Sequence, residues 1–138
     1  MSRGRVYLAA RYDRRLEMAA KARELEDHGF TVTSRWVQGL HEGATDPATL
    51  GRCAWDDLED IEQADIFITF TEAPDAGYTS GGRHVELGYA LANDLSVIVV
   101  GPAENVFHHL GLAIEGDAPM TRVDSWEEAL DFLWAGPA

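Results

Sequence analysis

Short runs of apolar residues alternate along this chain with longer segments in which apolar residues recur every three or four positions. The short runs predict buried strands, and the periodic segments predict helices. We expect strands at Val6–Ala10, Thr31–Trp36, Ile66–Phe70 and Ser96–Val100, and a weaker last one at Arg122–Val123. We expect helices at Asp13–His28, Ala48–Ala64, Gly81–Asn93 and Ser125–Trp134, with loops at Val37–Pro47 and Glu72–Ser80.

The alternation of strands and helices predicts one α/β domain over residues 1–138. Continuous apolar strands are typical of a mostly parallel sheet, here of five strands, with helices on both faces in a three-layer arrangement. In a sheet of strand order 2-1-3-4-5, ligands bind outside the carboxyl ends of the strands. The segments Ala9–Arg15, Phe70–Gly82 and Gly101–His109 should then surround one crevice.

Composition and charge narrow the functional classes. The chain has 138 residues, 46% of them hydrophobic, and a net charge of −13, which disfavours binding to nucleic-acid polymers or anionic membranes. A single cysteine, Cys53, excludes an internal disulfide and a cysteine-based zinc cluster. Because no segment looks like a transmembrane helix or a signal peptide, we expect a soluble, cytoplasmic protein.

Glu86 is the most informative residue, because it is the only charged one in the segment 85–92, VELGYALA. A carboxylate in such an apolar helix needs a partner or a function. Gly81 and Gly82 precede it, so a ligand can approach closely and the helix dipole favours an anion. We therefore expect a carboxylate held ionised for nucleophilic attack. The alternative is an ion pair with Arg83, one turn earlier.

The predicted helix Ala48–Ala64 carries many acids, and helical geometry separates Asp57 from them. Five of the six residues three, four and seven positions away from Asp57 are uncharged, so we expect Asp57 to face the apolar side. An inward carboxylate can act as an acid, a base or a hydrogen-bond acceptor. The alternative is a structural cap or salt bridge. The other acids of this helix should face water: Asp56, Glu59, Asp60 and Glu62.

Two loop segments are candidate anion sites. The segment after the first strand holds three of the ten arginines, which can receive a phosphate or carboxylate or can be ordinary surface residues: Arg11, Arg14 and Arg15. The segment before the third predicted helix resembles an anion nest: Ser80, Gly81 and Gly82.

Two other kinds of polar side chain need separate interpretations. Tyr7 lies within the first predicted strand, so its hydroxyl needs a hydrogen-bond partner. His84 with Glu86, and His108 with His109, do not have a recognised metal-ligand spacing. We therefore expect no metal site.

Three segments together resemble a known family: Val6–Ala10, Asp57–Asp65 and Gly82–Ala90. They are similar to segments of the nucleoside 2-deoxyribosyltransferases and the related nucleoside 5′-monophosphate N-glycosidases, in the same order, over roughly residues 5–101. The last segment is the most specific, because the family's catalytic Glu lies in a Glu-Leu-Gly-Tyr-Ala-like run. The resemblance implies that Glu86 is the nucleophile, that Asp57 contacts or protonates the departing base, and that Tyr7 orients the nucleophile.

The resemblance also implies a flavodoxin-like, Rossmann-like fold and a homo-oligomer whose sites are completed by a neighbouring subunit. The transferases tend to have Asp six positions before the nucleophile, whereas the monophosphate hydrolases tend to have Ser, as at Ser80 here. Together with the arginines, this difference favours a nucleotide over a free nucleoside. In contrast, Ala10-Arg11 replaces the Gly-Ser pairing common in those hydrolases.

The function implied is cleavage of the N-glycosidic bond of a (deoxy)nucleoside or its 5′-monophosphate through a covalent glycosyl–Glu86 intermediate. The sugar then passes to another nucleobase or to water, and the sequence leaves both open. A carboxylate near C1′ stabilises the oxocarbenium character that develops there, so no metal or organic cofactor is needed. The alternative is a non-catalytic nucleotide-binding or sensing module. Two inward acids favour the enzyme, because binding alone does not require them.

Overall fold

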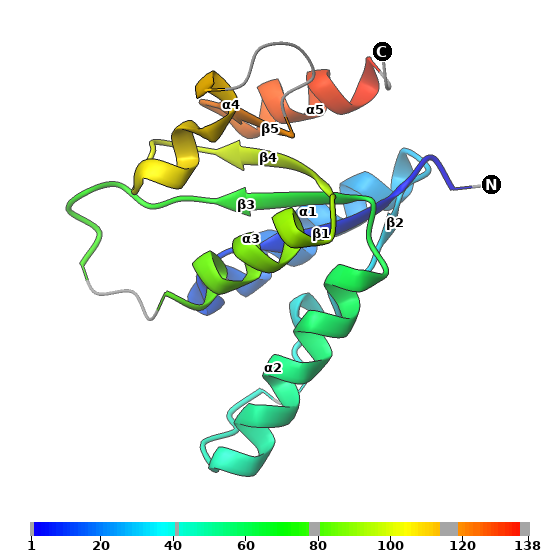
Figure 1. Ribbon diagram of the computed structural model, residues 1–138. Helices are drawn as coiled ribbons and strands as arrows, with labels where there is room; N and C mark the ends of the chain where they lie inside the picture. The colour runs from blue at the N-terminus through cyan, green and yellow to red at the C-terminus, as the bar shows by residue number, and fades with distance from the viewer. Residues whose placement is uncertain (1, 41, 78–80, 114–118, 136–138) are drawn as a thin grey trace.

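Five parallel strands form one sheet with the order β2-β1-β3-β4-β5 in the computed structural model, which describes residues 2–40, 42–77, 81–113 and 119–135 (Figure 1). The strands are β1 Arg5–Ala9, β2 Thr31–Val32, β3 Ile66–Phe70, β4 Ser96–Val100 and β5 Met120–Val123. The α-helices are α1 Arg15–Asp27, α2 Pro47–Glu62, α3 Gly82–Ala92, α4 Leu110–Ala113 and α5 Trp126–Trp134. Short 3₁₀ helices lie at η1 Tyr12–Arg14, η2 Arg35–Gln38 and η3 Val106–His109. The predicted α/β fold with a five-stranded sheet is confirmed, and the sheet is parallel throughout.

Alternate residues of β1 point to opposite faces of the sheet, and this alternation determines where the site forms. Val6 and Leu8 pack in the core beneath α1 and α5. Tyr7 and Ala9 pack in a second core, which includes Ile61 of α2 and residues of α3. Figure 1 shows α3 in front of the sheet and α1 behind it. Tyr7 therefore points toward the two helices that carry the candidate acids.

The second predicted strand is wrong beyond Val32, because the chain leaves the sheet and turns into η2. Beyond Val32, side chains take the place of a paired strand and hydrogen-bond the backbone groups along this edge of β1. The hydroxyl of Ser34 accepts a hydrogen bond from the backbone N–H of Leu8 at 3.1 Å. The indole N–H of Trp36 donates to the carbonyl of Leu8 at 2.7 Å. This turn carries Arg35 and Trp36 to the carboxyl end of the sheet, next to the site.

The starts of two helices follow local side-chain chemistry. Asp46 caps α2 by accepting a hydrogen bond from the backbone N–H of Thr49 at 3.0 Å, so the helix begins at Pro47. Ser125 caps α5, accepting a hydrogen bond from the backbone N–H of Glu128 at 3.2 Å. The helical turns at residues 106–113 were not predicted, because four-residue helices leave little periodic signal.

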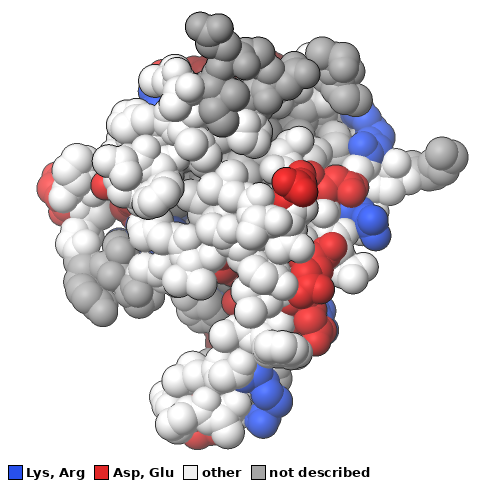
Figure 2. Space-filling view, viewed as in Figure 1, with Lys and Arg blue, Asp and Glu red and all other residues white. Residues whose placement is uncertain are grey.

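Charged side chains are distributed unevenly over the surface. Figure 2 shows acidic side chains along one edge of α2, whereas the face over α3 is largely uncharged. No helix in the described part of the chain is long and apolar enough to span a membrane.

Candidate active site

A cavity of about 440 Å³ opens between α2, η2, the segment after β1 and the first turns of α3. It lies beyond the carboxyl end of β1, where a parallel sheet is expected to bind ligands. Five residues singled out from the sequence line it: Arg11, Asp57, Gly81, Gly82 and Glu86. The topology therefore brings segments far apart in the sequence into one hollow.

The floor of this cavity holds a direct contact between Tyr7 and Glu86. The Tyr7 side chain is fully buried, and its ring stacks on Phe67 with the ring centres 5.6 Å apart. Its hydroxyl donates a short hydrogen bond to the Glu86 carboxyl. This contact supplies the partner that a tyrosine inside a strand requires, and it fixes where the carboxyl group lies.

The surroundings of Glu86 oppose the ionised state that its place in the sequence predicts. Burial raises the pKa of Glu86 to about 8, the Tyr7 hydrogen bond lowers it, and the charge of Asp57 raises it. Glu86 is the fifth residue of α3, beyond the first turn where the helix dipole acts most strongly. Loss of water around the carboxyl group therefore opposes the dipole and favours the protonated form.

The alternative pairing of Glu86 with Arg83 is also wrong. The buried Arg83 guanidinium makes two contacts with the carboxylate of Glu104, one of them at 2.8 Å between Nη2 and Oε1. Neither Arg83 nor Glu104 takes part in the contact between Tyr7 and Glu86. Glu86 is therefore left facing the cavity with Tyr7 as its hydrogen-bond donor.

Asp57 lines the cavity on the α2 side, as its spacing predicted. The pKa of Asp57 is raised to about 7, mainly by burial and then by the charges of Asp60 and Asp56, while Arg35 lowers it. The expectation that the other acids of this helix face water is wrong for Asp60, which is buried. Its carboxylate accepts from the Arg35 backbone N–H at 2.9 Å and from Nε of the same arginine at 2.8 Å. The structural salt bridge of α2 thus belongs to Asp60.

The three arginines after β1 do not act together. Arg11 lines the cavity, but it also pairs with Asp13 and Glu72. Arg14 and Arg15 are not among the described residues that line the cavity, because acids elsewhere bind each of them. The ion-pair partners of Arg14 are Glu17 and Glu72, and that of Arg15 is Glu42.

The glycines before α3 leave open space at the cavity wall. Gly81 adopts a left-handed conformation with φ of +82°, which a side chain would strain, and the helix begins at Gly82. A Cβ atom on either glycine would meet no atom of the described chain within 4 Å. Both glycines line the cavity, and the space that a side chain would fill at each is open. Ser80, the third member of the predicted nest, lies outside the described residues.

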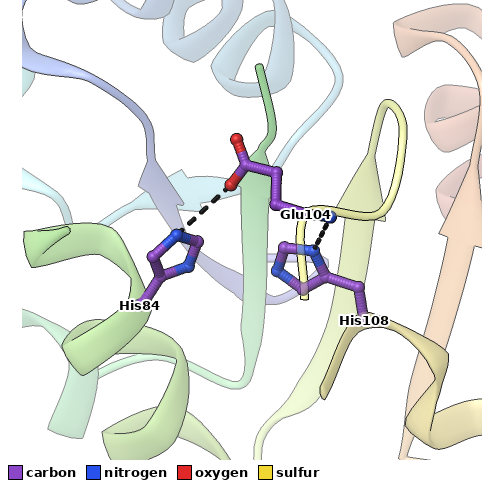
Figure 3. A group of neighbouring side chains, drawn as sticks. All are labelled: His84, Glu104 and His108. Atoms are coloured by element: carbon purple, nitrogen blue, oxygen red, sulfur yellow. Dashed lines mark hydrogen bonds and ion pairs between the residues drawn. The ribbon is translucent and has the colours of Figure 1, made fainter. Parts of the chain in front are cut away.

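His84, Glu104 and His108 lie together beside this site, with candidate ligand atoms within 4.8 Å of one another (Figure 3). Their hydrogen bonds do not suit a metal ion. Nδ1 of His108 accepts the Glu104 backbone N–H at 2.9 Å, so the ring proton of the neutral form lies on Nε2. Metal-binding histidines instead donate from the nitrogen that does not bind the metal. The Glu104 carboxylate is also occupied by Arg83.

Two aromatic residues of the cavity were not identified from the sequence. Tyr12 and Trp36 lie with their ring centres 6.1 Å apart and tilted by 38°. They give the cavity an aromatic wall opposite the acidic floor. Trp36 was assigned to a strand, and Tyr12 was passed over between two arginines. Their shared position depends on the turn at η2, which local sequence does not reveal.

Comparison with known proteins identifies similar structures. No protein-family model matches the chain, and no curated protein sequence matches it. The structure of the CMP N-glycosidase BcmB of Clostridium botulinum is similar, with a TM-score of 0.58 and 26% identity over 95% of this chain and 98% of that one. The structure of a 2-deoxyribosyltransferase from the psychrotolerant bacterium Bacillus psychrosaccharolyticus is also similar, with a TM-score of 0.64 and 25% identity over 91% of this chain and 89% of that one.

The chain has the fold of these two enzymes. This finding confirms the resemblance predicted from the three sequence segments. The similarity covers nearly the whole chain in each case.

Proposed function

We propose that this chain cleaves the N-glycosidic bond of a nucleoside or its 5′-monophosphate, with Glu86 as nucleophile, Asp57 as acid and Tyr7 orienting Glu86. One observation carries the proposal. The buried Tyr7 hydroxyl fixes the Glu86 carboxyl in a cavity that Asp57 also lines, in a chain with the fold of an N-glycosidase and a deoxyribosyltransferase.

The reaction proceeds in two displacements at C1′ of the sugar. The Glu86 carboxylate attacks C1′ as the bond to the base nitrogen breaks, and the bonding pair leaves with the base while Asp57 donates a proton to it. A glycosyl ester on Glu86 results. Water or a second base then attacks C1′ and Glu86 departs, while Asp57 takes up the proton that the incoming nucleophile releases. Two inversions retain the configuration of the sugar.

The raised pKa values fit a shared proton. The first step needs Glu86 ionised and Asp57 protonated, which together require one proton on the pair of acids. The pKa values of about 7 for Asp57 and about 8 for Glu86 favour one proton on the two acids between these pH values, held mainly by Glu86. The reactive form is the less populated one, in which Asp57 holds that proton. Closely placed acids with coupled pKa values are a common feature of sites that transfer protons.

We propose that the substrate is a 5′-monophosphate bound by Arg11, Ser80, Gly81 and Gly82. Support comes from the position of Arg11 at the cavity and from the open glycine backbone at the start of α3. Arg11 already pairs with Asp13 at 3.1 Å, so a phosphate must compete with that acid. Of the three arginines after β1, Arg11 is the one that lines the cavity.

We propose that the chain works as a homo-oligomer in which a second copy covers the cavity mouth. Apolar side chains on α2 and α3 support this proposal: Trp55 is 65% exposed and Val85 is 70% exposed. Substitution of Trp55 by Glu should shift the protein toward monomer in analytical ultracentrifugation. An unchanged sedimentation coefficient would exclude this surface as the interface.

Incubation of the protein with a panel of nucleosides and 5′-monophosphates, with and without a second free base, tests the function directly. Release of base alone indicates a hydrolase, and a new nucleoside indicates a transferase. Binding without either product would reject catalysis and favour the nucleotide-sensing module.

A further inference from the structure

The start of α3 is tied to the rest of the chain by one ion pair. Arg83, in the first turn, has a side chain only 3% exposed, and Glu104, in the loop after β4, has one 18% exposed. The two guanidinium nitrogens of Arg83 each meet one carboxylate oxygen of Glu104. This bidentate arrangement fixes both distance and orientation.

Glu104 makes further bonds that join three segments. Its Oε1 accepts the backbone N–H of Glu72, after β3, at 2.8 Å. Its Oε2 lies 3.3 Å from Nε2 of His84, and its own backbone N–H donates to His108 at 2.9 Å (Figure 3). One carboxylate therefore connects the loops after β3 and β4 to the helix that carries Glu86.

The helix start has little other support within the described residues. Gly81 and Gly82 begin α3 without a capping side chain from those residues, and neither glycine has a Cβ to pack against a neighbour. Glu86 lies three positions after Arg83, so any tilt of the first turn moves its carboxyl relative to Tyr7. A displacement of about 1 Å in such a site can cost on the order of 100-fold in rate.

We propose that Glu104 is a positioning residue that, through Arg83, sets the first turn of α3 so that the Glu86 carboxyl meets the Tyr7 hydroxyl. This inference rests on the proposed function of Glu86 as nucleophile. Glu104 touches neither Tyr7 nor the cavity floor in the contacts that the described residues make, so it acts through the helix.

Two routes could carry a change at Glu104 to Glu86. The pKa of Glu86 responds to its burial, to the Tyr7 hydrogen bond and to the charge of Asp57, so movement of the helix alters it. The charge of Arg83, left unpaired without Glu104, is the other route, and a variant that also removes Arg83 separates the two. Movement toward water would lower the pKa of Glu86 toward its ordinary value of 4.5, because burial is the largest cause of its elevation.

The first test compares Glu104→Gln with Asp124→Asn, which removes an exposed ion pair with Arg122. Well below the melting temperature, Glu104→Gln should lower kcat about 10- to 100-fold with little change in KM, whereas the control keeps full activity. In a Tyr7→Phe background the same substitution should cost less than about twofold, because the contact it serves is already gone. A full, multiplicative loss in that background would overturn the positioning role.

A second readout does not depend on turnover. Carbon NMR titration of the Glu86 carboxyl should give a lower pKa in Glu104→Gln than in the unmodified chain, with no change in Asp124→Asn. An unchanged Glu86 titration in a folded Glu104→Gln protein would reject the proposal. If no substrate is turned over, the proposed function fails while this titration still decides the positioning role.

Loss of the Glu104 charge leaves the buried Arg83 without its ion-pair partner, so Glu104→Gln can fail to fold. The double variant Arg83→Met with Glu104→Gln removes that unpaired charge together with the ion pair. The same lowered kcat and lowered Glu86 pKa are expected in it. Wild-type values for both in the folded double variant would overturn the inference.

Discussion

Replacing Glu86 by Gln should stabilise the protein, and increasingly so as the pH rises. Glu86 has a pKa of about 8 in the folded chain against an ordinary value of 4.5. The folded state therefore binds this proton more tightly than the unfolded state does, so the contribution is fully present below about pH 4.5 and is lost as pH rises toward 8. Glutamine keeps an acceptor for the Tyr7 hydroxyl and never ionises.

The magnitude follows from the same two pKa values. At about 1.4 kcal/mol per pH unit, the elevation corresponds to about 5 kcal/mol as an upper bound. The carboxyl group faces a solvent-accessible cavity, which screens its charge, so we expect about 2 to 3 kcal/mol. The Gln variant should match the unmodified chain near pH 4.5 and exceed it by that amount above pH 8.

Urea unfolding curves at several pH values between 4.5 and 9 measure this difference. The exposed α5 residue Glu127, replaced by Gln, serves as the matched control and should follow the unmodified chain throughout. The Glu86→Gln variant should also lose base release, because an amide cannot form the glycosyl ester. A constant stability difference across the pH range, or destabilisation above pH 8, would refute the account of a partly buried Glu86 with a raised pKa.

The remaining predictions concern turnover. Asp57→Asn should lower kcat about 10²- to 10⁴-fold with little change in KM. A substrate whose leaving group needs no proton should restore most of the rate. An equal loss of rate on that substrate would show that Asp57 has a structural role. The pH profile of kcat/KM should be bell-shaped, with limbs near pH 7 and 8 set by Asp57 and Glu86, because the active state holds one shared proton. A flat profile from pH 6 to 9 would contradict this prediction. The preference for a 5′-monophosphate over its nucleoside, measured as the ratio of kcat/KM values, should fall about tenfold in Arg11→Ala and in Ser80→Ala. This preference should also weaken as the salt concentration rises. An unchanged ratio in both variants would exclude the phosphate site.

The sequence predicted the parts of the fold that depend on local pattern. The bounds of β3 and β4 are as predicted, because each is a five-residue apolar strand with no competing turn chemistry. Glu86 and Tyr7 were both singled out as polar groups in apolar elements, and the structure joins them by a hydrogen bond. A polar group that interrupts an apolar pattern is visible from sequence even when its partner is not.

The errors came from contacts between elements distant in the chain. Asp60 looked exposed because helical spacing reveals only neighbours on its own helix, whereas its partner Arg35 comes from η2. The pairing of Arg83 with Glu104 was unpredictable for the same reason, since 21 residues separate them. The raised pKa of Glu86 was not predicted, because spacing indicates a helix dipole but does not give the depth of burial.

Trapping of the sugar on Glu86 tests the central claim most directly. The protein is mixed with a nucleoside 5′-monophosphate or nucleoside that it cleaves, quenched in acid within milliseconds, and analysed by mass spectrometry before and after digestion. We expect an added mass of one glycosyl group, located on the peptide that contains Glu86 and absent from Glu86→Gln. Base release at full rate by Glu86→Gln, or a sugar attached to a different residue, would contradict the account.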